Sequence, residues 1–350
     1  MSNFIKIFFV LSLVCTPVFT AQIETFYGVV NIEEPVLVEL IESPAFQRLK
    51  HIHQYGVAYY TTHREEYTRY DHSLGVFLLL RAKNCSLEEQ IAGLLHDVSH
   101  TIFSHVGDWI FKQQDKETDF QTLTHIDYLE KSGLGDIVRK YGYAVEEVLP
   151  KQELFPALEQ PLPSLCADRL DYNLQGAFYQ NFMTYDEVLS LFNEIQFIDG
   201  QWVSNDQDLL KKLMRFSIFM TQDCWGSGTG YVQSMWLADA ILRGVDIGAI
   251  TIEDIRFGTD NDVWNRLLIL DDPLIRNYMH MILHSPDYHS HASKEASNLF
   301  VKSKFRGIDP FVIIDGKYVR LTATDPVLAE EFQQAKERMN NGWSLILTNF

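Results

Sequence analysis

Histidine and aspartate gather in one short stretch of this chain. Eight of its twelve histidines lie between His51 and His125, and the densest run, residues 96–108, reads HDVSHTIFSHVGD. This run directly follows the apolar segment 91–95, where burying imidazole and carboxylate groups is costly unless they are paired or bind a cation. A divalent metal ion is the simplest explanation. Nitrogen and oxygen ligands without thiolate suit Zn, Fe or Mn, and Mg also stays open.

Two further metal ligands can be nominated from distant segments. His72 stands in RYDHSLG, where a strongly apolar stretch begins, and Asp168 stands in ADRLDY. We expect a helix to carry His96 and His100, which then share one face because they are four residues apart. An isolated His-Asp pair is more often a structural hydrogen bond than a metal site. The prediction therefore depends on the ordered set of His72, His96-Asp97 and Asp168, whose three segments must converge.

Helical patterns dominate the elements that must position these side chains. Apolar residues recur at helical spacing in five segments: 39–52, 73–82, 186–195, 206–220 and 230–242. Ser86 and Glu89 form a capping box that opens another helix, running to His96. Two β-branched runs flank Asp315-Gly316 and predict a hairpin. The expected fold class is mainly α: a helical bundle with a helical C-terminal extension and a small β-hairpin element.

The charge of the chain limits its partners. Its 350 residues include 29 Lys and Arg against 47 Asp and Glu, which gives a formal net charge of −18. Such a surface repels phosphate backbones, so non-specific nucleic-acid binding is not expected. An anionic substrate must be held by a local basic cluster or a metal. Four scattered cysteines form neither a disulfide framework nor a CxxC site, and no apolar run reaches the roughly 18 residues of a transmembrane span.

The first 21 residues have the layout of a secretory signal peptide. Lys6 precedes an apolar run, and the small residues Thr20-Ala21 stand at the expected cleavage site. A buried first strand or helix is the alternative interpretation. Cleavage would make this an exported protein, periplasmic or secreted, whereas the uncleaved chain would be cytoplasmic.

Several motifs around these ligands resemble one known family. The set His72, His96-Asp97 and Asp168 looks like the metal-binding signature of the HD-domain phosphohydrolases. The branch it resembles is that of the deoxynucleoside triphosphate triphosphohydrolases, which includes the dGTPases and the dNTPase with a sterile-alpha-motif domain. The similar motifs are FQRLK (46–50), QYG (54–56), RYDHSLGV (69–76), HDVSHTIFSH (96–105) and ADRLDY (167–172). After the signal peptide expected at 1–21, we therefore expect an HD phosphohydrolase domain with a helical extension at 22–255 and a C-terminal α+β region at 256–350.

The resemblance implies a role for each candidate residue. One divalent metal ion would be held by His72, His96, Asp97 and Asp168. The catalytic residues would be His125, Asp108 and His100. Among them, His125 would donate a proton to a departing oxygen, and Asp108 would orient the His125 ring. Substrate contacts would come from Gln54, Arg69, His105, Arg169 and Tyr172.

A few positions depart from the pattern of this branch. Ser99 stands where glycine is usual, and Ile126 stands where a glutamate usually follows the catalytic histidine. Gln175-Gly176 replaces an Arg-Asp pair whose aspartate binds the sugar 3′-hydroxyl. Tyr55 replaces a smaller leucine beside the sugar. These departures put a preference for deoxynucleoside triphosphates in question, but they leave the metal site intact.

Structural roles are the alternative for several of these residues. Arg69 and Arg169 could form ion pairs with Asp71 and Asp171, and His125 could be an ordinary helix residue. Four C-terminal histidines look ligand-like by number, but no carboxylate set accompanies them, so we expect them to be structural or solvated: His280, His284, His289 and His291.

The favoured function is metal-dependent hydrolysis of a (deoxy)nucleoside triphosphate to nucleoside and triphosphate. One alternative is an HD phosphohydrolase of another phosphate ester, such as a nucleoside monophosphate or a signalling nucleotide. The other is a catalytically silent HD module that binds a nucleotide. The expected partners are a small nucleotide or phosphate ester and, by the resemblance, other copies of the same chain.

Overall fold

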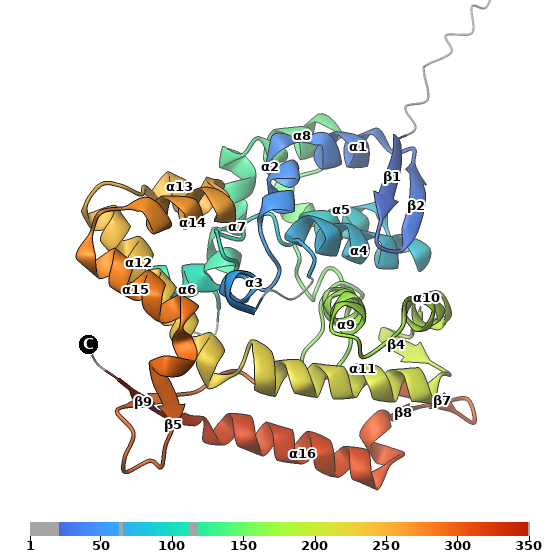
Figure 1. The fold of residues 1–350 in the computed structure, drawn as a ribbon. Coiled ribbons are helices and arrows are strands. Elements are labelled where there is room, and N and C mark those ends of the chain that lie inside the picture. The colour runs from blue at the N-terminus through green and yellow to red at the C-terminus, as the bar shows by residue number, and fades with distance from the viewer. Residues whose placement is uncertain (1–20, 63–65, 113–117, 349–350) are drawn as a thin grey trace, which may run out of the picture.

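Helices make up most of the computed structural model, which describes residues 21–62, 66–112 and 118–348 (Figure 1). The N-terminal half contains α1 (Pro35–Glu42), α2 (Pro44–Gln47), α3 (Val57–Thr62), α4 (Arg69–Ala82), α5 (Leu87–Leu95), α6 (Val106–Ile110), α7 (Phe120–Lys131), α8 (Leu134–Lys140) and α9 (Ala167–Tyr179). The C-terminal half contains α10 (Tyr185–Glu194), α11 (Gln207–Phe219), α12 (Gly228–Asp246), α13 (Ile252–Phe257), α14 (Asp260–Ile269), α15 (Pro273–Leu283) and α16 (Pro326–Asn341). The expected mainly α fold class is confirmed.

Three hydrophobic clusters hold these helices together. One packs α1, α4, α5, α7 and α8 at the top of Figure 1, and a second packs α3, α6, α12, α14 and α15 on its left. The third lies between α9, α11 and α16. The HD phosphohydrolase domain expected from the sequence ends at residue 255. Residues on both sides of this position share the second cluster, in which Ile102 and Val106 are buried together with Ile255 and Val263.

Small β-sheets pair the strands that lie between and beside the helices. The hairpin predicted around Asp315-Gly316 is confirmed as β7 (Phe311–Ile314) and β8 (Lys317–Arg320), and both turn residues have the positive φ angles that such a tight turn requires. This hairpin extends a sheet that also contains β3 (Gln196–Ile198) and β4 (Gln201–Ser204). The sequence patterns predicted neither β3 and β4 nor the remaining strands, which are β1 (Ala21–Thr25), β2 (Gly28–Ile32), β5 (His289–His291), β6 (Leu299–Val301) and β9 (Trp343–Leu347).

The start of α5 agrees only in part with the predicted capping box. The Ser86 hydroxyl accepts the Glu89 backbone N–H at 3.2 Å, as predicted. The Glu89 carboxylate does not complete the box. It accepts instead the backbone N–H groups of Ala157 and Leu158, at 3.0 and 3.1 Å, and so ties α5 to a segment far along the chain.

The end of α5 corrects another expectation. The helix stops at Leu95, and residues 96–99 form a turn, so His96 and His100 do not share a helical face. At this turn the backbone leaves the helix, and the Nδ1 atom of His96 reaches back to the Gly93 carbonyl oxygen at 2.7 Å. The polar cluster therefore lies just beyond a buried helix, where its side chains can point in several directions.

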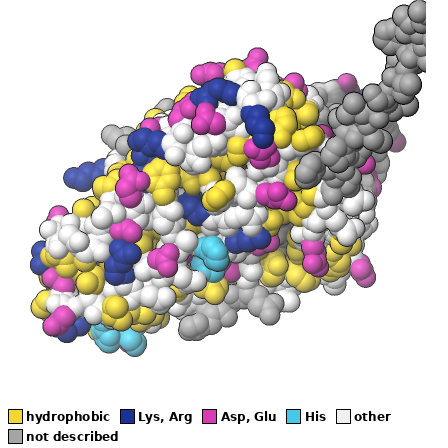
Figure 2. Space-filling model, turned by 90° about the horizontal axis from the view of Figure 1, so that it is seen from above, with side chains coloured by type: hydrophobic (Ala, Val, Ile, Leu, Met, Phe, Trp, Pro, Cys, Tyr) yellow, Lys and Arg dark blue, Asp and Glu magenta, His cyan; other side chains and the backbone are white. Residues whose placement is uncertain are grey.

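The predicted signal peptide lies almost entirely outside the described residues, which begin at Ala21, the first residue of β1. None of the helices within the described ranges is long and apolar enough to cross a membrane. On the face shown in Figure 2, Lys and Arg side chains are interspersed with Asp and Glu, and no broad basic surface is visible.

Candidate metal centre

His72 reaches the centre from the first turn of α4. Thr68 caps α4 by accepting the backbone N–H of Asp71, while the Asp71 carboxylate accepts the backbone N–H of Thr68. This capping box fixes the first turn of α4, which carries Arg69 and His72 into the interior. His72 is completely buried, and its Nε2 atom lies 3.0 Å from Asp168 Oδ1 in the first turn of α9.

His96 and Asp97 complete the group from the turn after α5. The Nε2 atoms of His96 and His72 are 3.2 Å apart, and His96 Nε2 lies 3.6 Å from Asp168 Oδ1. The ligand atoms of His72, His96 and Asp168 all lie within 4.8 Å of one another. Asp97 Oδ2 lies 3.6 Å from His72 Nε2, and Asp97 Oδ1 lies 3.6 Å from His96 Nε2. The structure thus brings the four predicted ligands together from three distant segments.

The hydrogen bonds of the two imidazoles show that this group fits a cation. The Nδ1 atom of His72 is 2.6 Å from an Asp171 carboxylate oxygen, and that of His96 is 2.7 Å from the Gly93 carbonyl oxygen. Both partners only accept, so each Nδ1 carries the proton, and in the neutral rings each Nε2 presents a lone pair. Two lone pairs that face each other at 3.2 Å beside carboxylates repel unless a proton or a metal cation lies between them. Metal-bound histidines show the same arrangement, with the second nitrogen held by an acceptor.

The pKa shifts of His72 and Asp168 also indicate that this group fits a cation. Burial opposes protonation of His72, but its hydrogen bonds to Asp168 and Asp171 outweigh this and raise its pKa to about 10. Despite burial, hydrogen bonds from His72 and His96 hold the pKa of Asp168 well below its usual range. The carboxylates therefore attract positive charge to this position, and a divalent ion supplies more of it than a proton does.

Asp97 is held by three side chains around the centre. Arg69 Nη1 donates to Asp97 Oδ2 at 2.5 Å, and both side chains are almost fully buried. His100 Nε2 and the Gln121 amide both lie near Asp97 Oδ1, at 3.2 and 3.0 Å. The alternative pairing of Arg69 with Asp71 is wrong, because Asp71 caps α4. Arg69 also donates through Nε to Ser104, so its contacts orient the centre.

His125 lies beside the centre, but its partner is not the predicted one. Its Nδ1 atom is 2.8 Å from the Ser99 hydroxyl, whereas its Nε2 atom is buried with no hydrogen-bond partner among the described residues. Asp108 instead accepts the backbone N–H of Phe120 at 2.8 Å. Ser99, which replaces the usual glycine, therefore takes the orienting position expected for Asp108. Burial and nearby His96 lower the pKa of His125 to about 4, so the free ring is neutral.

The predicted residues His100, His105 and Asp108 surround a small hollow of about 10 Å³, enough for about one water molecule. His105 is half exposed, and its ring packs edge-on against His100 at 5.1 Å. Burial and the charge of Arg69 lower the pKa of His100 to about 4. Two residues that line this hollow, His100 and Gln121, also contact Asp97.

The remaining predicted substrate residues lie around α9. Arg169 is half-buried and donates to the Ser164 carbonyl oxygen at 2.9 Å, so its alternative pairing with Asp171 is wrong. The Tyr172 ring packs edge-on against Trp225, with 5.7 Å between ring centroids. Burial raises the pKa of Tyr172, and the charges of Arg169 and Arg306 partly oppose this rise. The Gln54 side-chain oxygen is buried without a hydrogen-bond partner in the described part of the chain.

Sequence reasoning missed Asp171 and Gln121 as parts of the centre. Asp171 stands one helical turn after Asp168, a spacing that places both carboxylates on the same face of α9. No comparable pattern marks Gln121, which reaches the centre from α7. The expectation for the C-terminal histidines stays untested. His289 contacts Thr229 and the Ser285 carbonyl oxygen, and His280 packs on His284.

Comparison with known proteins agrees with this site. The HD domain family model matches residues 69–172, which contain the four candidate ligands. The chain is 43% identical over 247 residues to the metal-dependent phosphohydrolase cns2 of Cordyceps militaris, covering 69% of this chain and 71% of that protein. It is 30% identical over 307 residues to the uncharacterised Bacillus subtilis protein YdhJ, covering 88% and 93% of the two chains.

More distant matches extend the comparison. The human deoxynucleoside triphosphate triphosphohydrolase SAMHD1 is 31% identical over 153 residues, which cover 37% of this chain and 24% of that protein. The fold resembles the crystal structure of a phosphohydrolase from Bacteroides thetaiotaomicron, with a TM-score of 0.68 and 17% identity, covering 94% of this chain and all of that chain.

The fold, the converging ligands and these relatives define the class of the protein. The chain belongs to the HD-domain phosphohydrolases and is a metal-dependent phosphohydrolase. The identity of the metal stays open, because a set of two imidazoles and carboxylates is shared by several divalent ions.

Proposed function

We propose that this protein hydrolyses a phosphate ester of a nucleotide, and that a nucleoside monophosphate is its preferred type of substrate. The observation that carries the proposal is the meeting of His72, His96 and Asp168 at one point, with His125 beside them. Hydrolysis of a phosphate ester needs positive charge at a phosphate oxygen and a proton donor for the departing oxygen. The site offers a group for each task.

The residues of this chain divide the work as follows. His72, His96, Asp97 and Asp168 would hold the divalent ion, which when bound supplies Lewis acidity at a phosphate oxygen. The negative charge of a bound phosphate favours protonation of the nearby His125 ring. The Ser99 hydroxyl holds Nδ1 of His125, which leaves Nε2 as the atom that moves a proton to the departing oxygen. Arg169 is a half-buried cation that would contact the phosphate.

The surroundings of Gly176 favour a monophosphate over a deoxynucleoside triphosphate. The resemblance assigns a sugar-binding aspartate to this position, but a Cβ atom there would lie 2.6 Å from Phe216 Cζ and 3.1 Å from the Tyr55 hydroxyl. Those two rings fill the space that a longer side chain would need. A triphosphate also carries more negative charge than a monophosphate, and the nearby Arg69 is already committed to Asp97.

Triphosphate hydrolysis is the second candidate. It is supported by the similarity to SAMHD1, whose name states that activity, over a segment that includes the centre. The same metal ligands and His125 would serve both reactions, so the two candidates differ only in how the rest of the substrate is held.

A substrate panel separates these candidates. Metal-loaded protein is incubated with nucleoside monophosphates and with ribo- and deoxyribonucleoside triphosphates, and products are resolved by ion-exchange chromatography. We expect release of inorganic phosphate from a monophosphate. Release of triphosphate from a deoxynucleoside triphosphate as the faster reaction would establish the second candidate instead. No turnover of any substrate by protein with a full complement of metal would contradict both.

A further inference from the structure

The N-terminal hairpin reaches the metal centre through one tyrosine. Strands β1 and β2 pair in antiparallel register from Ala21↔Ile32 to Thr25↔Gly28, which leaves Phe26 and Tyr27 in the turn. The Tyr27 hydroxyl donates to Asp171 Oδ1 at 2.8 Å, although the two residues are 144 positions apart. Asp171 is the same residue that holds the Nδ1 atom of His72.

Asp171 is a fully buried carboxylate whose position is fixed from several sides. Its Oδ2 atom lies 2.6 Å from His72 Nδ1, and the Gln175 amide donates to both of its oxygens at 3.0 and 3.1 Å. It packs so closely on α4 that a Cβ atom at Gly75 would lie 1.9 Å from Oδ1. A buried anion is stable only when donors satisfy its oxygens, so the Tyr27 hydroxyl contributes directly to the anion that orients His72.

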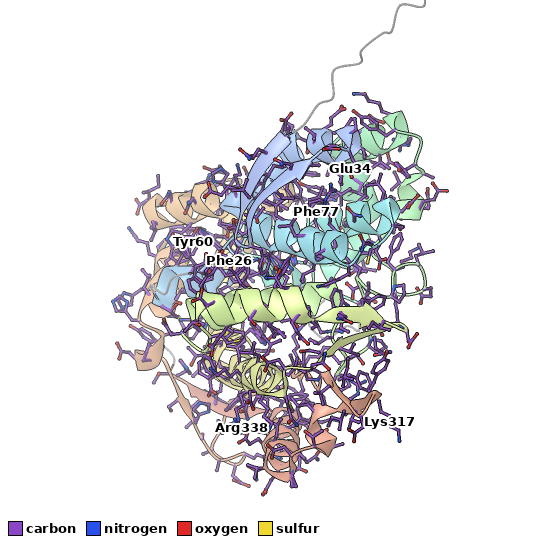
Figure 3. All side chains as sticks on the ribbon, turned by 90° about the vertical axis from the view of Figure 1, so that its right-hand side faces the viewer. Phe26, Glu34, Tyr60, Phe77, Lys317 and Arg338 are labelled. Atoms are coloured by element: carbon purple, nitrogen blue, oxygen red, sulfur yellow. The ribbon has the colours of Figure 1, made fainter. Side chains whose placement is uncertain are left out.

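The Tyr27 ring is held in place independently of its hydroxyl group. It stacks on Phe192 with ring centroids 4.2 Å apart. The neighbouring Phe26 packs on Phe178 and Tyr185, and Figure 3 shows Phe26 at the tip of the hairpin, where the hairpin meets the helices. The Tyr185 hydroxyl also donates to the Phe26 carbonyl oxygen at 2.9 Å. Removing only the Tyr27 hydroxyl should therefore leave the hairpin docked.

We propose that Tyr27 is a positioning residue of the metal centre, acting through Asp171 on His72. The chain of contacts runs from the hairpin turn to a buried carboxylate and from there to a metal-ligating imidazole. Without the hydroxyl, the buried anion has fewer donors, and its hold on the His72 ring weakens. The hairpin is thus a part of the centre and not merely a decoration of the helical body.

The test compares two tyrosine-to-phenylalanine variants of the full chain, Tyr27→Phe and Tyr185→Phe. Both remove one hydroxyl from the hairpin contact, but only Tyr27 touches Asp171. Binding of Co²⁺ is measured by titration calorimetry, and the visible absorption of the Co²⁺-loaded protein reports the ligand geometry. Removing a direct partner of a metal ligand weakens affinity about 10- to 100-fold. Because Tyr27 acts one step further out, we expect a loss of roughly three- to tenfold, together with a changed absorption spectrum.

Tyr185→Phe should keep the affinity and spectrum of the unaltered protein. A third variant, Asp171→Asn, removes the intermediary, and in that background Tyr27→Phe should have no further effect. The proposal is overturned if Tyr27→Phe binds Co²⁺ with unaltered affinity and spectrum, if Tyr185→Phe shows an equal loss, or if the Tyr27 and Asp171 effects simply add. No substrate is involved, so these outcomes are independent of which phosphate ester the enzyme cleaves.

Discussion

Replacing Arg69 by methionine should destabilise the metal-free protein far more than the metal-bound protein. The Arg69 side chain lies beside the metal centre and is only 5% exposed. It donates hydrogen bonds to the Asp97 carboxylate at 2.5 Å and to the Ser104 hydroxyl at 3.0 Å. Methionine keeps most of the buried stem but removes the charge. Asp97 would then be a buried carboxylate without its strongest partner.

The expected magnitude follows from this geometry. Removing one partner of a buried ion pair costs about 3–5 kcal/mol, because the other charge stays buried and unpaired. The lost bond to Ser104 adds about 1 kcal/mol. In the metal-bound protein the divalent ion lies next to Asp97 and neutralises it, so the loss should fall to less than half of that value. Metal affinity should rise, because Arg69 repels the ion.

The assay is urea denaturation of both proteins, once with a chelator and once with saturating metal. Arg215→Met is the matched control, because the ion pair of Arg215 with Glu331 is exposed and should contribute little to the free energy of unfolding in either condition. An equal destabilisation of Arg69→Met with and without metal would refute the reasoning, since it would mean that the ion does not reach Asp97.

Three further changes test other parts of the site. Gly75→Ala should cost about 1–3 kcal/mol in the free energy of unfolding and weaken metal binding, because the new methyl group displaces Asp171; denaturation and calorimetry measure both. His125→Ala should lower kcat roughly 100-fold or more at unchanged metal content, measured by steady-state kinetics and elemental analysis. Burial raises the pKa of Asp260 from 3.8 to about 6, so protonation stabilises the fold. That stability, about 3 kcal/mol, is lost as pH rises from about 4 to about 6, and Asp260→Asn should remove this pH dependence in denaturation curves.

For each of these three predictions, one result would contradict the expected outcome. Gly135→Ala is the control for Gly75→Ala, because its Cβ would meet nothing closer than 3.1 Å; equal effects of the two would argue against the crowding of Asp171. Full turnover by His125→Ala would remove the proposed proton donor. If the stability difference between the unaltered protein and Asp260→Asn stays constant from pH 4 to 7, Asp260 is not the buried acid that the structure indicates.

The convergence of the candidate metal ligands could be predicted because their residue types are rarely buried without a reason. His72, His96, Asp97 and Asp168 each stand next to apolar segments, and the resemblance supplied their order along the chain. The helix limits around them were less certain. The α5 helix ends at Leu95, directly before the polar cluster. There the His96 side chain bonds back to the Gly93 carbonyl oxygen, and helix propensity alone does not predict where such a contact ends a helix.

The partners that orient these ligands could not be predicted, because they depend on contacts between distant segments. Tyr27 meets Asp171 only when the N-terminal hairpin docks on α9, and Gln121 meets Asp97 only when α7 packs beside the turn after α5. The expected pairing of Asp108 with His125 was wrong for a related reason. The Asp108 carboxylate accepts the backbone N–H of Phe120, and the Ser99 hydroxyl contacts His125 instead.

The number of divalent ions bound per chain tests the central claim most directly. The unaltered protein and a His96→Ala, Asp168→Ala double variant are loaded with metal and dialysed against metal-free buffer. Their metal content is then measured by inductively coupled plasma mass spectrometry. The convergence of His72, His96, Asp97 and Asp168 predicts one ion per chain in the unaltered protein and almost none in the folded double variant. Equal metal content in the two proteins, or no retained metal in either, would contradict the account.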